Sequence, residues 1–192
     1  NLIGNQETNI HLVRSRGIAI SGNHIYTGVK RSLVLEDCHH IVVGANSLDQ
    51  SHNFRGGFTN GVTVKNCDGV VLQGLILDRA GEAEEGGAIE ILNSRETTIS
   101  GCQIFEPNHR GLYLSESRNT RVSDNLILHR GEGATMVAAI EVAGSCPGTV
   151  ISGNLVGTGS AGDIVTPPDT DYTRENHPAA PAPDPVPPAS AP

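Results

Sequence analysis

Three residues that could do chemistry share one place in the sequence pattern. Glu90, Tyr113 and Glu141 each stand in the middle of an apolar-any-apolar triplet. The middle residue of an alternating strand points away from the core, so we expect these side chains on one outer surface. If the strands stack about 4.8 Å apart, the two glutamates lie about 10 Å apart. This is near the roughly 6.5 to 9.5 Å of inverting glycosidases and too wide for retaining ones.

The loops beside these triplets are rich in Arg, His and carboxylates, and the chain has eleven Arg but only two Lys. Arginine can bind a sugar carboxylate through two N–H donors, and a sugar ring can stack on a tyrosine ring. We predict acid/base or metal-binding roles for Glu90 and Glu141, and steering or deprotonation by Arg110, His109 and Arg130. Predicted substrate contacts are Tyr113, Arg79, His129, Asn108, His52 and Arg55. The alternative is an ordinary solvated face, on which these residues carry no chemistry.

Acidic residues in one of these loops could hold a cation. Asp78, Glu82 and Glu85 supply the oxygen ligands that Ca²⁺ prefers. A solvated charged loop explains the same residues, so calcium is an optional cofactor and none is required.

These residues are positioned by an internal repeat. A short phrase recurs six times with an Asn column at Asn23, Asn46, Leu75, Cys102, Asn125 and Asn154, at steps of 23 to 29 residues. A second apolar triplet lies between successive copies, so each repeat holds three short strands. Such a unit cannot bury an apolar face alone and must stack on its neighbours. We predict an all-β parallel β-helix of about six coils, with the inward Asn amides bonded along the stack. A leucine-rich repeat and a β-sandwich fit the pattern less well.

The phrases Ile20–Ile25 and Gly111–Ser115 resemble the repeats of right-handed parallel β-helix proteins of the pectate-lyase-like superfamily, over roughly Ile10 to Ile164. The resemblance implies a cleft on the sheet of the second triplets and its flanking loops. Lyases of that group use a basic residue beside a uronate, often with calcium, and hydrolases use several Asp. No cluster of three Asp falls in the expected groove, which argues against polygalacturonase-like hydrolysis.

The fold hosts enzymes and non-enzymes alike, so activity does not follow from it. Our first interpretation is a carbohydrate-active protein that cleaves an acidic polysaccharide, as a lyase or a hydrolase. The alternative is a noncatalytic module for glycan binding, surface attachment or spacing. Either interpretation predicts a secreted, periplasmic or cell-surface protein.

Composition limits the partners and the domains. A formal charge of −8 argues against nucleic acid and anionic membranes, and no run of about 18 apolar residues is present for membrane insertion. We expect the β-helix over residues 1–166, truncated at its amino end. Nine of the last 26 residues are Pro, which predicts an extended, disordered tail over 167–192 that could lead to a further domain.

Cys38 and Cys67 occupy equivalent places in adjacent repeats. The expected strand spacing is compatible with a disulfide, and equally with two small buried residues stacked in the interior.

Overall fold

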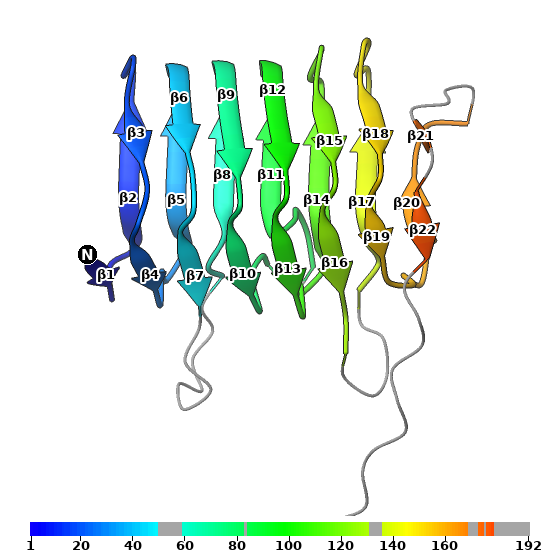
Figure 1. Cartoon of the computed structure of the whole chain (residues 1–192), viewed down its shortest axis with the longest axis horizontal. Coiled ribbons are helices and arrows are strands. Elements are labelled where there is room, and N and C mark those ends of the chain that lie inside the picture. The colour runs from blue at the N-terminus through cyan, green and yellow to red at the C-terminus, as the bar shows by residue number, and fades with distance from the viewer. Residues whose placement is uncertain (50–58, 83, 131–135, 169–172, 175, 179–192) are drawn as a thin grey trace, which may run out of the picture.

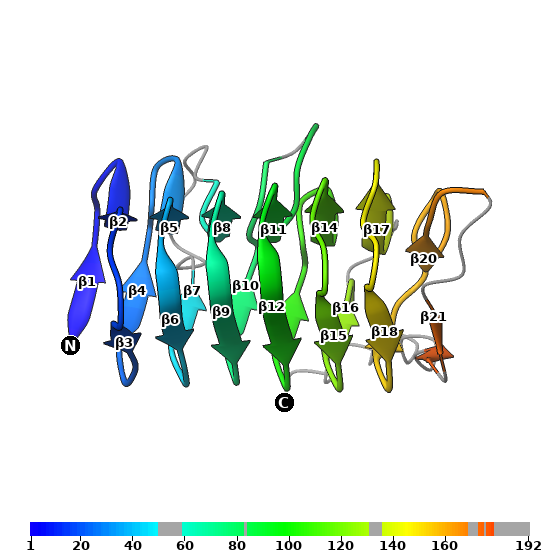
Figure 2. The same cartoon turned by 90° about the horizontal axis from the view of Figure 1, so that it is seen from above.

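The chain folds into a parallel β-helix (Figure 1), described by a computed structural model for residues 1–49, 59–82, 84–130, 136–168, 173–174 and 176–178. Each coil contributes one strand to each of three sheets, and every neighbouring pair is parallel. Figure 2 shows the coils following one another along the axis from β1 to β21. Across the described residues, no helix has the length and apolarity needed to cross a bilayer.

Sheet A has eight strands: β1 (Leu2–Gly4), β4 (His24–Tyr26), β7 (Ser47–Asp49), β10 (Ile76–Asp78), β13 (Gln103–Phe105), β16 (Leu126–Leu128), β19 (Leu155–Val156) and β22 (His177–Pro178). Sheet B has seven: β2 (Thr8–Val13), β5 (Arg31–Glu36), β8 (Val62–Lys65), β11 (Ile89–Leu92), β14 (Arg110–Ser115), β17 (Ala138–Ala143) and β20 (Ile164–Val165). Sheet C also has seven: β3 (Ala19–Ile20), β6 (His39–Val43), β9 (Asp68–Gln73), β12 (Arg95–Ser100), β15 (Arg121–Ser123), β18 (Val150–Ser152) and β21 (Thr173–Arg174).

The repeated apolar triplets form sheet B, as their alternation predicts. In β5, for example, Leu33 and Leu35 are fully buried while Val34 between them is half-buried and points outward. Stacked Leu, Ile and Val side chains fill the interior, with no large aromatic among the buried residues described. The predicted all-β coil is therefore confirmed.

The helix has one more coil than the six repeats in the sequence. The last coil is made of β20, β21 and β22, so the coiled pattern continues to residue 178. The predicted boundary between 166 and 167 therefore falls inside this coil. The apolar triplet pattern fades there, but Asn176 still occupies the Asn column and accepts from Asn154 Nδ2 at 2.9 Å.

The predicted amide ladder lines the corner between sheets C and A. Asn23 Nδ2 donates to Asn46 Oδ1 at 3.0 Å, and Asn1 Nδ2 donates to Asn23 Oδ1 at 2.8 Å. The same bonds recur between Asn125 and Asn154, at 2.9 Å. Leu75 and Cys102 interrupt the ladder in its middle and are fully buried. Because each amide donates and accepts inside the core, its polar atoms are satisfied there.

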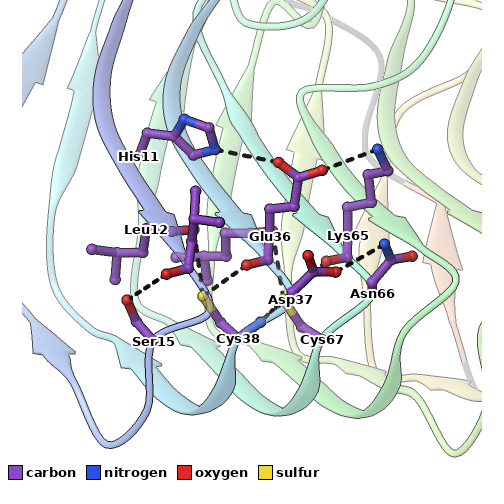
Figure 3. A network of polar contacts seen from close by, with 11 residues as sticks. His11, Leu12, Ser15, Glu36, Asp37, Cys38, Lys65, Asn66 and Cys67 are labelled. Carbon is purple, nitrogen blue, oxygen red and sulfur yellow. Dashed lines mark hydrogen bonds and ion pairs between the residues drawn. The ribbon is translucent and has the colours of Figure 1, made fainter.

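A second ladder of small polar side chains lines the corner between sheets B and C (Figure 3). Cys38 and Cys67 are stacked in adjacent coils, and the backbone N–H of Cys38 donates to Cys67 Sγ at 3.3 Å. Ser94 and Ser117 continue the column with the same contact, in which Ser94 N donates to Ser117 Oγ at 3.1 Å. All four cysteines are free thiols, so the stacked interpretation applies rather than the disulfide. Burial raises the pKa of the Cys67 thiol to about 11.

Candidate functional site

A polar groove of about 500 Å³ lies on the outer face of sheet B. The register pairs Glu90 with Tyr113 and Tyr113 with Glu141, so the three side chains share one strip, as the alternation predicts. The groove is lined by Arg31, Glu82, Glu84, Glu85, Gly86, Glu90, Leu92, Arg110 and Tyr113. The sheet forms its floor, and the loop between β10 and β11 forms its wall.

Glu90 is held in a buried ion pair. Its carboxylate accepts from a guanidinium nitrogen of Arg31, and the two side chains are only 9% and 11% exposed. Thr63 Oγ1 donates to the other carboxylate oxygen at 2.8 Å. Arg31 comes from β5, two coils before Glu90, and reaches across β8 to make the pair. Both oxygens of Glu90 are therefore occupied by protein donors.

Glu141 is paired in the same way with Arg110. Nε of Arg110 lies 2.5 Å from Oε2 of Glu141, and Nη2 lies 3.4 Å from Oε1, which makes a fork between adjacent strands. The Arg110 guanidinium also lies over the Tyr113 ring, 5.1 Å from its centroid. This pair is somewhat more exposed than the first, at 17% and 18%. The ring and the two charges therefore form one contact cluster.

The two ion pairs also hold the wall of the groove in place. Arg31 Nη1 donates to the carbonyl oxygen of Gly87 at 3.1 Å, and Arg110 Nη1 donates to that of Gly86 at 3.3 Å. The N–H of Gly87 donates to Glu90 Oε1 at 3.2 Å. Gly86 has a φ of +66°, and a Cβ there would overlap Oε1 of Glu90. Glycine is thus required by both backbone conformation and space.

The groove is acidic overall. Arg31 and Arg110 are matched by Glu90 and Glu141, and the wall adds Glu82, Glu84 and Glu85, of which the last two are exposed. The lining holds two arginines and four glutamates, and Glu141, which is paired with Arg110 beside it, brings the excess to three negative charges. The expectation of an acidic substrate at this site is therefore disfavoured by long-range electrostatics.

The other predicted residues of the β13–β14 loop do not line the groove. Asn108 Nδ2 donates to the carbonyl oxygen of Gly81 at 2.6 Å, which ties its own loop to the preceding one. His109 is half-buried, and its carbonyl oxygen accepts from Val137 N at 2.7 Å. These contacts hold one coil to the next, so both residues stand outside the described lining.

Arg79, His129 and Arg130, which we predicted near the groove, lie instead in a separate cluster at the end of sheet A. His129 Nε2 lies 3.3 Å from Oε2 of Glu106, and Arg130 Nε lies 3.6 Å from Oε1. The Arg130 guanidinium is stacked 4.1 Å from the centroid of Phe105. Arg79 Nε lies 3.8 Å from Oδ2 of Asp78. Arg79, His129 and Arg130 are thus not brought to the groove, because the chain leaves sheet A before it turns toward sheet B.

The structure does not gather the predicted calcium ligands. Among the described residues, no group of three or more His, Cys, Asp and Glu side chains could hold a metal ion. Glu82 and Glu85 line the groove, whereas Asp78 lies at the end of β10 in sheet A. Two further predicted contacts, His52 and Arg55, lie outside the described residues.

Arg31 is the groove residue that the sequence pattern did not single out. It stands two residues before the first Leu of its triplet, as Arg110 does in the fourth triplet of the chain. The registers of β5 with β8, β8 with β11 and β11 with β14 align Arg31, Asn60, Gly87 and Arg110 at the same position of successive coils. Arg31 and Arg110 therefore stand in one column. A comparison of repeats at that position would have found it.

Comparison with known families agrees with this architecture. A family model described as right handed beta helix region matches residues 8–174. No curated protein and no solved structure matches the chain. Since the match covers most of the chain and the three sheets are those of a β-solenoid, this protein belongs to the right-handed β-helix family.

Proposed function

We propose that the chain is a noncatalytic glycan-binding β-helix that holds a neutral or amino-sugar chain in the groove of sheet B. The observation that carries the proposal is the strip of Glu90, Tyr113 and Glu141 in register, with both carboxylates paired to arginines that line a groove of about 500 Å³. Planar charged groups and a tyrosine ring side by side are suited to sugar hydroxyls and sugar faces. Such a protein would act where glycans are displayed, outside the cell, in the periplasm or at the cell surface.

The ion pairs favour binding over catalysis. An acid/base catalyst must exchange a proton with the substrate within hydrogen-bond reach. The Glu90 carboxylate is 9% exposed and already accepts from Arg31, Thr63 and Gly87. If the Glu90 carboxylate left these partners to reach a substrate, the buried Arg31 guanidinium would lose its counter-charge, which costs free energy. The pairs are better placed to keep the groove rigid, which lowers the entropic cost of binding.

The test is binding of the full chain to a panel of soluble glycans by isothermal titration calorimetry. The panel contains neutral glucans and mannans, chitosan oligomers with free amines, and oligogalacturonates. We expect a neutral or amino-sugar chain to bind and Tyr113→Ala to weaken its binding about tenfold or more. Tyr26→Ala, on the outer face of sheet A, is the matched control and should bind as the wild type does. The proposal fails if no glycan binds, or if both tyrosine variants lose affinity equally.

Inverting hydrolysis is the second candidate, and one observation favours it. Glu90 and Glu141 lie two strands apart in one column, about 10 Å at the backbone, with Tyr113 between them. If the chain hydrolyses a glycan, new reducing ends should appear, and both Glu90→Gln and Glu141→Gln should abolish them. A lyase would instead release unsaturated products that absorb in the ultraviolet. If neither product forms from a glycan that binds, both enzymatic alternatives are excluded for that glycan.

A further inference from the structure

A second groove, unrelated to the first, runs along the corner between sheets B and C. Its volume is about 520 Å³, and it crosses several coils at the far end of the sheet B strands from the variable loops. One wall carries Asp68, Arg95 and Arg118, and the opposite wall carries Asn93 and Glu116. The floor is the buried ladder that includes Ser94. The side chains that line the groove are therefore almost all polar.

Two arginines stand on adjacent coils of this groove. Arg95 and Arg118 are joined by a parallel bridge, so their backbones are about 4.8 Å apart. Like charges placed directly opposite each other on neighbouring strands repel. An anion between the two guanidinium groups would replace that repulsion with two attractive contacts.

The lining holds two carboxylates, Asp68 and Glu116, for its two arginines, but neither carboxylate pairs with Arg118. Arg95 Nη2 donates to Asp68 Oδ2 at 2.7 Å, and this bond lowers the pKa of the Asp68 carboxyl. His39 Nδ1 lies 3.8 Å from the same oxygen, so Asp68 is shared between Arg95 and His39. Glu116 reaches toward the next coil, where its Oε1 accepts from the backbone N–H of Ser145 at 3.4 Å. Arg118 is exposed, and it makes no ion pair with any carboxylate of the described residues. Arg118 thus has N–H donors without a carboxylate partner, and it stands beside Arg95, which uses one of its nitrogens on Asp68.

We propose that this corner groove binds an acidic carbohydrate chain by holding a sulfate or carboxylate group between Arg95 and Arg118. A guanidinium matches the planar geometry of both anions and binds them through paired N–H donors. Exposed amide groups such as those of Asn66 and Asn93 suit the neutral parts of a sugar chain. Nucleic acid fits less well, because the described lining contains no Phe, Tyr or Trp on which a base could stack.

The test measures binding of the full chain to four probes: a sulfated heparin oligosaccharide, an oligogalacturonate, neutral dextran and single-stranded DNA. We expect one or both acidic glycans to bind the wild type, and Arg95→Gln/Arg118→Gln to weaken that binding about tenfold or more. The matched control is Arg121→Gln, an exposed arginine on the outer face of sheet C that does not line the groove. Arg121→Gln should bind as the wild type does, and Tyr113→Ala reports whether the acidic glycan occupies the sheet B groove instead.

Comparing the two acidic probes tells which anion is held. Thermal melting of the double variant checks its fold, and little change is expected because an exposed pair such as Arg95–Asp68 contributes little to stability. The proposal is wrong if neither acidic glycan binds, if DNA binds as tightly, if the double variant weakens dextran binding as much as acidic-glycan binding, or if Arg121→Gln weakens acidic-glycan binding as much as the double variant. Loss of binding in Tyr113→Ala alone would assign the acidic glycan to the sheet B groove instead.

Discussion

Replacing Arg31 by Met should destabilise the protein by about 3 kcal/mol. The change leaves the Glu90 carboxylate buried without its guanidinium, and breaking a buried pair from one side typically costs about 3 to 5 kcal/mol. Thr63 and Gly87 still donate to Glu90, at 2.8 and 3.2 Å, which places the expected loss at the lower end. The lost bond from Arg31 to the Gly87 carbonyl adds to the effect.

Urea unfolding at neutral pH measures this loss, with two variants for comparison. Lys65→Met breaks the exposed pair with Glu36, whose side chains are 50% and 32% exposed, and should cost less than about 1 kcal/mol. Arg31→Met/Glu90→Met removes both charges and should recover most of the stability. The comparison holds when all variants share the same slope m of unfolding free energy against urea concentration. A changed m would indicate that the solenoid unfolds in parts. Equal losses in Arg31→Met and Lys65→Met, or a double variant less stable than either single one, would refute the reasoning.

Three further changes test the fold around the site. Gly86→Ala places a methyl group against the Glu90 carboxylate at a φ of +66°, so we expect a fall in melting temperature of several degrees by calorimetry. Thr120→Val should stabilise by about 1 kcal/mol in urea, since this hydroxyl is 1% exposed and has no hydrogen-bond partner among the described residues. Cys67 has a pKa raised from 9.0 to about 11, so the unfolded chain loses this proton first. Its contribution to stability is complete below pH 9 and declines as pH rises toward 11. In alkaline unfolding series, Cys67→Ser should flatten this decline, and an unchanged decline would contradict the assignment.

The sequence predicted the column positions of the groove because a strand has a period of two and the coils stack in register. Glu90, Tyr113 and Glu141 follow from that rule alone. Their pairing did not follow, since Arg31 reaches Glu90 from two coils away, and the period of a strand does not say how far a long side chain extends across the sheet. Side chains in variable loops have no register, which is why Arg130 stacks on a ring of sheet A instead of facing the groove.

The last coil of the helix carries less of the sequence pattern than the middle coils do. Residues 167–178 are rich in Pro and polar residues and lack the apolar triplets that mark the other coils. Thr173–Arg174 and His177–Pro178 still pair with the preceding coil through the backbone, which needs no particular side chain. Asn176 was the one side-chain signal there, and a single Asn is a weak indicator without its neighbours.

The interruption of the amide ladder at Leu75 and Cys102 divides the hydrogen-bonded dipoles of that corner into two separate series, one on each side of the coils that bear Glu90 and Tyr113. Dipoles polarise one another only along an unbroken series. The side-chain amides therefore cannot reinforce one another from one tip of the coil to the other, and backbone hydrogen bonds and the apolar core join the two series at this corner.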